Sequence, residues 1–438
     1  MPWGSSPPKT RDATIPSDAR SSSSRPPPVP VDFPSREGRA VAVRVTPVAE
    51  RAIRSGHPWV FENSIREMSR QAPAGSTAVI FDRKDRFMAV GLLDPESPIR
   101  VRILQEGSPA ELGEALFRER IRQSLELRSP LVRRSDTTGY RMVSGEGDRF
   151  PGLVIDRYGA GVVVKSYTPA WLPWLPDLLP VLRELEGVES IVHLPSRRLL
   201  NDPAVPEALR EPVQLLGPAP EDGFPFLEEG LHFRAHPRVG HKTGFYLDQR
   251  ENRSRVRRLA KDARVLNAFS YTGGFSVAAA AGGAREVTSL DLSGPALHEA
   301  ERHFTLNRAS APRARHRIIE GDAFEKLEAL GQAGERFDLV IVDPPSFARE
   351  RGQEDDALGA YAALTRLALP LLDPGGILVQ ASCTARIEAD TFFHIVLDTA
   401  RRMHSPLDEI ERTGHPPDHP IRHPEGAYLK CLFARNRG

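Results

Sequence analysis

Residues 264–291, R-V-L-N-A-F-S-Y-T-G-G-F-S-V-A-A-A-A-G-G-A-R-E-V-T-S-L-D, constrain the fold of this chain more than any other stretch. They predict a buried strand, a glycine turn, an apolar helix and a second strand that ends in an acid. Gly273 and Gly274 let the backbone turn tightly and approach a ligand without a Cβ in the way. Asp291 lies one crossover later, where a doubly wound sheet places the carboxylate that holds a ribose diol. The third glycine of G-x-G-x-x-G is absent, which favours a nucleoside over a dinucleotide. A βαβ unit without a ligand is the alternative for this stretch alone.

Length, charge and cysteine content narrow the class of protein. A chain of 438 residues is long enough for two or three domains. Its net charge of +1 creates no general attraction to nucleic acid, so such a partner must meet a local basic patch. Cys383 and Cys431 are the only cysteines, which excludes a disulfide framework and a cysteine-rich zinc site. No apolar run approaches the roughly 20 residues of a membrane span, and the first residues contain no apolar signal core. We expect a cytoplasmic enzyme or binding protein with no membrane contact and no metal.

The pattern along the chain predicts four segments. Residues 1–38 are rich in Pro and Ser and are predicted to be disordered. Residues 39–108 contain short strands between turn residues, which is typical of a small β-barrel. Residues 109–235 mix helices and strands in a central α+β domain, with a proline-rich loop over 203–225. Residues 236–438 alternate short apolar runs with helical stretches, which predicts an open, mostly parallel α/β sheet.

Two further acids follow strands of this predicted sheet, at the edge where ligands bind in open α/β folds. Asp322, in G-D-A-F, is suited to accept an adenine amino proton, and is equally suited to be a helix N-cap. Asp343 ends the buried strand of F-D-L-V-I-V-D-P-P-S-F, before two prolines that make the loop rigid and remove its N–H donors. Such a loop can grip a planar, amide-like acceptor, on which Phe347 would stack. The structural alternative is that Asp343-Pro is merely a turn.

The two cysteines receive different interpretations. The strand after Asp373-Pro-Gly-Gly delivers Cys383 to the same sheet edge as Asp343. A free cysteine is often only a small buried hydrophobe, but this position favours a nucleophile. Cys431, within Y-L-K-C-L-F, has apolar neighbours on a terminal strand and is predicted to be structural.

Three groups outside the sheet are candidate ligand contacts. Residues 241–250, H-K-T-G-F-Y-L-D-Q-R, precede the first strand, so Lys242, Tyr246 and Gln249 are placed to close over a cofactor. The predicted helix over residues 250–264 carries seven Lys or Arg against two acids, which fits a solvated face or a phosphate-binding patch. Trp59 and its neighbour Phe61, in G-H-P-W-V-F, are either a base-stacking platform or the core of the β domain.

Nine motifs together resemble the RlmI-like S-adenosylmethionine-dependent methyltransferases, which methylate carbon 5 of a cytosine in large-subunit (23S) ribosomal RNA. They are H-P-W-V-F, Y-R-M-V-S-G-E-G-D, P-G-L-V-I-D-R-Y-G, H-K-T-G-F-Y-L-D-Q-R, N-A-F-S-Y-T-G-G-F, F-D-L-V-I-V-D-P-P-S-F, S-C-T, D-H-P-I and P-E-G-A-Y-L-K. The resemblance covers about residues 40–438. It implies a PUA-type RNA-binding barrel over 39–108, the central α+β domain over 109–235, and a Rossmann-like class I methyltransferase domain over 236–438. Two departures are Ser346, where the family often has Lys, and Thr384, where Ser is usual.

The resemblance also implies S-adenosylmethionine as cofactor and ribosomal RNA as partner. It leaves open whether the protein forms a homodimer. Cys383 and Asp343 are the implied catalytic residues. The residues expected at the cofactor are Lys242, Tyr246, Gln249, Asn267, Phe269, Tyr271, Thr272, Gly273, Gly274, Asp291, Leu292, Asp322, Ala323, Asp343 and Pro344. Those expected at the RNA are Trp59, Arg250, Pro345 and Phe347.

The implied mechanism begins with addition of a Cys383 thiolate to carbon 6, which makes carbon 5 nucleophilic. Asp343 would stabilise the adduct, and the target nucleotide must leave its stack to enter the pocket. The residues do not identify the base that removes the carbon 5 proton. A uridine-C5 methyltransferase would use the same cysteine, whereas a guanine-N7 or exocyclic-amine enzyme would need none. A non-catalytic RNA-binding assembly factor is the alternative from another class, and the missing glycine disfavours a nicotinamide dehydrogenase.

Overall fold

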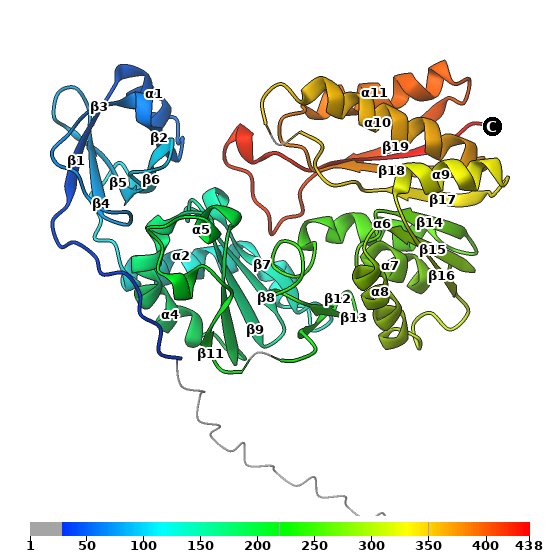
Figure 1. The fold of residues 1–438 in the computed structure, drawn as a ribbon, viewed down its shortest axis with the longest axis horizontal. Coiled ribbons are helices and arrows are strands. Elements are labelled where there is room, and N and C mark those ends of the chain that lie inside the picture. Colours follow the sequence, from blue (N-terminus) through cyan, green and yellow to red (C-terminus); the bar gives the residue numbers. More distant parts are fainter. Residues whose placement is uncertain (1–28, 219, 349) are drawn as a thin grey trace, which may run out of the picture.

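The computed structural model describes residues 29–218, 220–348 and 350–438, and arranges them as three units in a row (Figure 1). Of the tail predicted to be disordered, residues 1–28 lie outside the described residues. Residues 29–38 run as an extended segment along the central unit, where Val29 N donates to Leu215 O at 3.0 Å and Arg36 pairs with Asp177 at 2.7 Å. The disorder prediction is therefore wrong for these ten residues.

The first unit is the predicted small β-barrel, a six-stranded sheet in the order β2-β6-β5-β4-β1-β3. Strict alternation in V-A-V-R-V buries Val41, Val43 and Val45 while the intervening residues face outward. A short helix, which Thr46 caps through its side chain, follows the first strand. The elements are β1 (Val41–Val45), α1 (Pro47–Arg54), β2 (Trp59–Phe61), β3 (Ile65–Met68), β4 (Thr77–Phe81), β5 (Phe87–Leu93) and β6 (Ile99–Glu106).

The second unit is a five-stranded sheet in the order β11-β10-β9-β8-β7, with α2 and α4 packed together beside it. Its elements are α2 (Glu114–Leu127), α3 (Ser129–Val132), β7 (Gly139–Ser144), β8 (Leu153–Tyr158), β9 (Gly161–Ser166), α4 (Leu175–Arg183), β10 (Ser190–Pro195), α5 (Arg197–Leu200) and β11 (Val213–Leu216). The aromatic rings of Phe117, Phe150 and Trp171 meet in its core. Part of the stretch predicted as a proline-rich loop is strand β11, which pairs antiparallel with β10.

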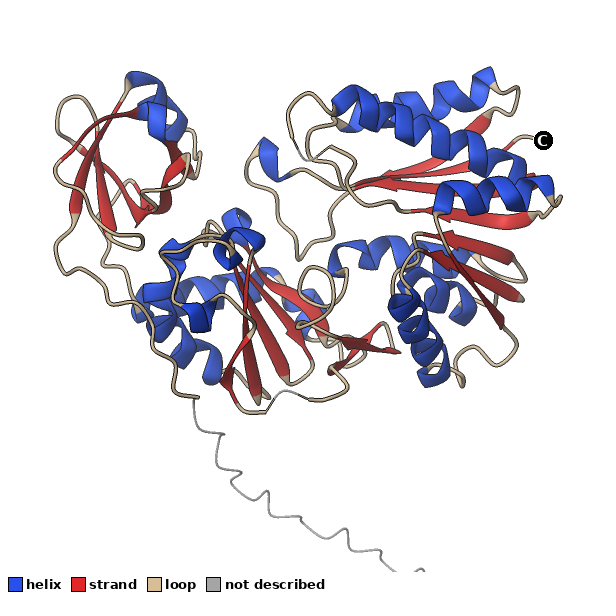
Figure 2. Cartoon of the chain, in the orientation of Figure 1, coloured by secondary structure: helices blue, strands red, loops and turns tan. Residues whose placement is uncertain are grey.

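The third unit is a seven-stranded sheet in the order β16-β15-β14-β17-β18-β20-β19, with helices on both faces (Figure 2). Strands β14 to β18 run parallel, and β20 pairs antiparallel with both of its neighbours, β18 and β19. Its elements are α6 (Arg250–Leu259), β14 (Arg264–Ala268), α7 (Gly274–Ala281), β15 (Glu286–Asp291), α8 (Gly294–Leu306), β16 (Arg315–Glu320), α9 (Ala323–Gln332), β17 (Phe337–Val342), α10 (Glu354–Ala368), β18 (Leu372–Ser382), α11 (Ala389–Arg402), β19 (Leu407–Thr413) and β20 (Lys430–Asn436). The strand order reverses between β14 and β17, which defines the switch point where ligands bind.

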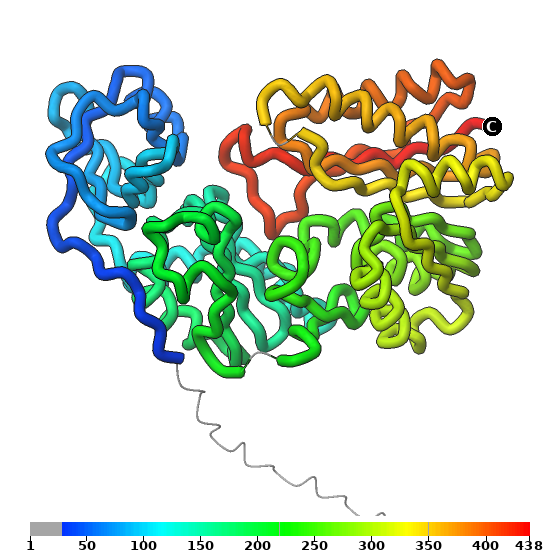
Figure 3. The backbone as a smooth tube through the Cα atoms, in the orientation of Figure 1, coloured from blue at the N-terminus to red at the C-terminus, as the bar shows by residue number. Residues whose placement is uncertain are grey.

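Two connections join the units. The hairpin of β12 (Phe224–Glu228) and β13 (Leu231–Ala235) places Phe226 in one core cluster with Tyr158 of the central sheet and Val256 of α6. The apolar core is therefore continuous across residue 235. The loop between β19 and β20, residues 414–429, leaves the third unit and reaches toward the other two, as the red tube in Figure 3 shows. No helix in the described part of the chain is long and apolar enough to cross a membrane.

Candidate active site

The glycine turn after β14 has an unusual backbone. Phe269, Tyr271 and Gly273 all have positive φ, at 60°, 47° and 76°, so three of five consecutive residues are left-handed. Non-glycine residues adopt this conformation at a cost and tend to do so at functional sites. The turn ends where α7 begins at Gly274, and Asn267 anchors its start by donating from Nδ2 to Ser276 Oγ at 2.9 Å.

Asp291, at the end of β15, is fixed against this turn. Its Oδ2 accepts from Tyr271 N at 2.7 Å and its Oδ1 accepts from Ser293 N at 2.9 Å. Each carboxylate oxygen keeps a second lone pair for a ligand hydroxyl. The next residue, Leu292, is 72% exposed. The arrangement presents an oriented acid and an apolar side chain together at the switch point.

Residues 241–250 lie against the glycine turn. His241 N donates to Tyr271 Oη at 2.8 Å, and the His241 and Tyr271 rings stack with centroids 5.1 Å apart. The Tyr246 ring meets the Tyr271 ring edge-on at 5.2 Å. The Lys242 ammonium pairs with Asp248 and lies 4.5 Å from the Tyr246 ring centroid. The structure thus brings Lys242, Tyr246 and Tyr271 together; their contact with a cofactor stays a prediction.

Asp343 and Cys383 follow neighbouring strands, because β17 and β18 pair in parallel up to Val342 and Gln380. Both side chains are half-buried, and Cys383 Sγ lies 3.9 Å from Pro344 O. Burial, aided by the charge of Asp248, raises the pKa of the Asp343 carboxyl to about 7. Burial also raises the pKa of the Cys383 thiol to about 11, although the Lys242 ammonium acts in the opposite direction. Near neutral pH the site therefore holds a thiol beside a carboxyl group that readily gains or loses a proton.

A hydrogen-bonded chain orients Asp343. Gln249 Nε2 donates to Asp343 Oδ1 at 3.0 Å, and Gln249 Oε1 accepts from Asn252 Nδ2 at 2.6 Å. Asn252 Oδ1 in turn accepts from Thr413 Oγ1 at 2.6 Å. Gln249, predicted to contact the cofactor, thus binds the catalytic candidate directly. The sequence analysis did not identify Asn252 or Thr413, since nothing in their local patterns distinguishes them.

The remaining predicted residues take varied positions. Asp322 is exposed and caps α9, where its Oδ1 accepts from Phe324 N at 2.9 Å, so its helix-cap interpretation is confirmed. Pro345 is exposed, whereas Phe347 is half-buried with its ring edge-on to Tyr361 at 5.1 Å. The buried residues of the predicted set are Gln249, Arg250, Asn267, Thr272, Gly273, Gly274, Ala323 and Pro344.

Comparison with known proteins assigns the chain to a family. Residues 207–435 match S-adenosylmethionine-dependent methyltransferases, and residues 43–106 match PUA-like domains. The chain is 44% identical over 404 residues to a ribosomal RNA large subunit methyltransferase of Deinococcus radiodurans, an alignment that covers 91% of this chain and 98% of that protein. The chain belongs to the S-adenosylmethionine-dependent methyltransferase family. It is also 35% identical over 383 residues to a ribosomal RNA large subunit methyltransferase I of Cronobacter sakazakii, covering 87% of this chain and 96% of that one.

Solved structures agree on the fold of this methyltransferase. A SAM-dependent methyltransferase from Streptococcus mutans matches with a TM-score of 0.76 at 22% identity, over 90% of this chain and 99% of that one. A methyltransferase complexed with SAH matches with a TM-score of 0.77 at the same identity and coverage. These likenesses support the arrangement of the three units.

S-adenosylmethionine is the cofactor of this methyltransferase, as it is of the family. The glycine turn fits such a ligand, because the buried hydroxyls of Ser270 and Thr272 have no hydrogen-bond partner within the described residues. Buried polar groups are normally satisfied, so these two are suited to a ligand or its water. Asp291 would hold the ribose, and the exposed Leu292 would contact the apolar face of the base.

The prediction that Arg250 contacts RNA is wrong. Arg250 is buried and makes two hydrogen bonds to Asp418, Nη1–Oδ2 at 3.0 Å and Nη2–Oδ1 at 2.7 Å. Its neighbours on α6 behave alike, since Arg253 pairs with Glu228 at 2.6 Å and Arg255 with Glu411 at 2.9 Å. These cations hold the fold together, so neither a solvated face nor a phosphate patch describes them.

The position of Trp59 fits neither of its two interpretations, a base-stacking platform or the core of the β domain. Its indole Nε1 donates to Glu146 Oε1 in the central unit at 3.0 Å, and its ring lies 5.1 Å from the His423 ring in the β19–β20 loop. The side chain is half-buried. Trp59 therefore belongs neither to the barrel core nor to a free stacking platform, but to the contact between the three units.

Proposed function

We propose that the protein methylates carbon 5 of a cytosine in large-subunit ribosomal RNA through a covalent adduct with Cys383. The position of Cys383 carries the proposal, because a thiol follows β18 beside Asp343, one strand away from the switch point between β14 and β17. Relatives at 35% and 44% identity bear ribosomal RNA large subunit methyltransferase names, which supports the RNA class. A methyltransferase acting on a nitrogen would have no need of this nucleophile.

Cys383 supplies the nucleophile that carbon 5 requires. Its sulfur forms a bond to carbon 6, and the electron pair of the 5,6 double bond becomes available at carbon 5. The ring then gathers negative charge at N3, where the neutral form of Asp343 donates a proton. The carboxylate form of Asp343 can in turn receive the proton that the thiol loses, so the two transfers balance. A carboxyl pKa of about 7 suits a group that must act in both directions.

The second half of the reaction restores the ring. S-adenosylmethionine supplies an electrophilic methyl group to carbon 5. A base or water then removes the carbon 5 proton, and the bond between carbon 6 and Cys383 Sγ breaks to regenerate the double bond. The N3 proton returns through Asp343 to the departing thiolate. The Gln249 amide keeps Asp343 oriented throughout, because Asn252 and Thr413 fix that amide from behind.

A methyl-transfer assay tests the proposal. Labelled S-adenosylmethionine and unmodified 23S ribosomal RNA are incubated with wild type, C383A and C431A, and the nucleosides of the product are identified. Wild type and C431A are expected to yield 5-methylcytidine, since Cys431 is fully buried on β20 and away from solvent. C383A is expected to yield none. A 5-methyluridine or N-methylated product, or full activity of C383A, would overturn the proposal.

A further inference from the structure

A cleft of about 350 Å³ lies where the barrel, the central unit and the β19–β20 loop meet. His57 and Gln105 of the barrel line it on one side. Arg149 of the central unit and Arg422 of the loop line it on the others. The cleft shares no lining residue with the candidate active site, so it is a separate feature of the surface.

Arg149 and Arg422 are exposed cations without a counterion. Neither side chain makes a hydrogen bond or ion pair with any residue that the structure describes. Arg149 also adopts a left-handed backbone, with φ at 62°. A glycine would occupy that conformation at lower cost, yet the position holds a long cation directed to the cleft wall.

A third arginine lies behind these two. Five arginines are buried in the described part of the chain, namely Arg102, Arg120, Arg128, Arg250 and Arg253. Four of them pair with a buried carboxylate: Arg102 with Asp94, Arg128 with Asp148, Arg250 with Asp418 and Arg253 with Glu228. Arg120 differs, because its guanidinium donates to Leu104 O, to Arg149 O at 2.5 Å and to Gln105 Oε1 at 3.1 Å. All of these acceptors are neutral.

Within the described part of the chain, no carboxylate forms an ion pair with Arg120, Arg149 or Arg422. Burial, together with the nearby charges of Arg149 and Arg422, lowers the pKa of Arg120 to about 10, which still leaves it protonated at neutral pH. A buried charge without a partner is unfavourable, and an external anion would relieve it. Two acids also line the cleft, Glu106 at the exposed rim and Glu146, whose Oε1 accepts from Trp59 Nε1 and Gly152 N. Neither acid forms an ion pair with the three arginines.

We propose that this cleft binds a phosphodiester of the RNA backbone next to the target nucleotide, with Arg149 and Arg422 as its direct ligands. The RNA identity rests on the proposed function. Guanidinium groups match phosphate oxygens in geometry and charge, and aromatic rings beside a basic groove are typical of single-stranded RNA sites. Here the His57 and Phe61 rings lie 6.0 Å apart, and Phe61 is 38% exposed. The site would hold the strand on the barrel side while the flipped base enters the sheet edge.

RNA affinity measured against salt concentration tests the site directly. The variant R149Q/R422Q is compared with wild type and with R313Q, using a labelled single-stranded RNA and the full chain. Arg313 is a matched control, since it is exposed, has no partner among the described residues and precedes the distant edge strand β16. Loss of the one phosphate contact that both arginines make on a single strand is expected to reduce the slope of log affinity against log salt by about 0.7. Affinity at a fixed salt concentration is expected to fall about tenfold or more, while R313Q matches wild type.

The outcomes separate this inference from the proposed function. Three results would overturn the site: unchanged affinity and slope in R149Q/R422Q, equal losses in R313Q, or no RNA binding by wild type. If R149Q/R422Q binds RNA unchanged, an acidic protein becomes the better partner for the cleft. Melting temperature and SAH affinity of the double variant should equal those of wild type, which excludes misfolding. If RNA binding depends on the arginines but wild type forms no 5-methylcytidine, only the proposed function fails. If the double variant methylates dilute RNA as wild type does, only the site fails.

Discussion

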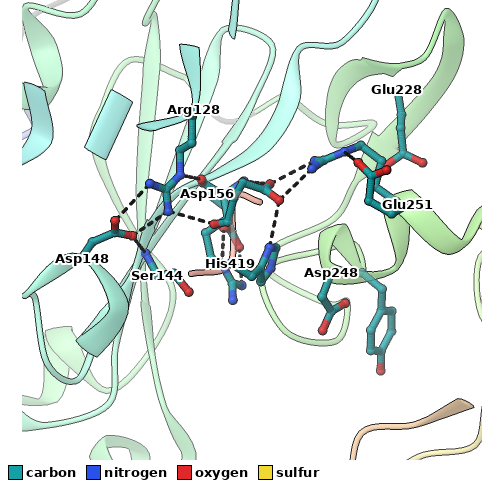
Figure 4. A network of polar contacts seen from close by, with 12 residues as sticks. Arg128, Ser144, Asp148, Asp156, Glu228, Asp248, Glu251 and His419 are labelled. Carbon is teal, nitrogen blue, oxygen red and sulfur yellow. Dashed lines mark hydrogen bonds and ion pairs between the residues drawn. The ribbon is translucent and has the colours of Figure 1, made fainter. Parts of the chain in front are cut away.

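Arg250 on α6 and Asp418 in the β19–β20 loop form a two-point ion pair, with both side chains almost completely buried. The same carboxylate accepts from Arg141 N of the central sheet at 3.0 Å, and Asp418 O accepts from Arg128 Nη2 at 2.8 Å. Figure 4 shows how this network gathers groups from separate units. One acidic residue thus ties α6 and the β19–β20 loop of the third unit to the central unit.

Removal of Asp418 should destabilise the protein strongly. D418A leaves the Arg250 guanidinium buried without its partner, which typically costs about 3–5 kcal/mol in the free energy of unfolding. The control D408A removes the exposed partner of Arg437 and should leave the stability nearly unchanged, because exposed ion pairs contribute little. Denaturant unfolding measures both. If D418A were no less stable than D408A, the ion pair would not hold the units together.

Asp343 should make stability depend on pH. The native carboxyl has a pKa of about 7, whereas the unfolded one titrates near 3.8, so the native state keeps its proton to higher pH. Its contribution to stability is complete below the unfolded pKa and is lost as pH rises through the folded pKa. D343N does not titrate, so its stability relative to wild type should increase between pH 4 and 8, by roughly 4 kcal/mol. A constant or falling difference in urea unfolding would show that the pKa of Asp343 is not raised.

Gln249 should tune that same pKa. The hydrogen bond from Gln249 favours the carboxylate form of Asp343, so its loss in Q249A should raise the pKa of Asp343 above about 7. Repeating the comparison with D343N in a Q249A background should therefore move the stability transition to higher pH. The same midpoint in both backgrounds would mean that Gln249 does not act on Asp343.

Asp291 should control cofactor affinity. D291N keeps the size of the side chain but removes its charge and one of the two acceptors that hold Tyr271 N and Ser293 N. SAH affinity, measured by calorimetry, is expected to fall about tenfold or more. The control D373N removes a charge at the start of β18, on the opposite edge of the same sheet. Equal SAH affinity of D291N and wild type would exclude Asp291 from the cofactor site.

Local patterns predicted the parts of the site that lie at strand ends. The glycine turn, Asp291, Asp343 and Cys383 each follow an apolar run, and a parallel sheet brings all such ends to one edge. Alternation of apolar residues likewise predicted the barrel. These features depend on neighbours within a few residues, which is the information that a single sequence carries.

Long-range contacts are what the sequence could not provide. The basic composition of α6 suggested a surface for phosphate, but Arg250 finds its carboxylate 168 residues away. Residues 29–38 were predicted to be disordered because they contain little apolar periodicity, yet Arg36 reaches Asp177 and lies 4.4 Å from the Trp174 ring centroid. In both cases the partner is supplied by tertiary structure alone.

The two departures from the family pattern meet in space. Ser346 Oγ lies 3.2 Å from Thr384 Oγ1, and Thr384 Oγ1 lies 2.7 Å from Tyr361 Oη. Their hydroxyls join the loops after β17 and β18, directly beside the residues proposed to carry the reaction. Sequence reasoning treats the positions as separate differences, whereas the structure makes them one contact that braces Asp343 and Cys383.

Trapping with 5-fluorocytidine-substituted ribosomal RNA tests the covalent role of Cys383 most directly. Fluorine at carbon 5 cannot leave as a proton, so a cysteine adduct should persist after methyl transfer and survive denaturing electrophoresis. Wild type and C431A with S-adenosylmethionine are expected to form this protein–RNA species, and C383A is expected to form none. A species of equal amount in C383A, or formation of 5-methylcytidine by wild type without any trapped adduct, would contradict the account.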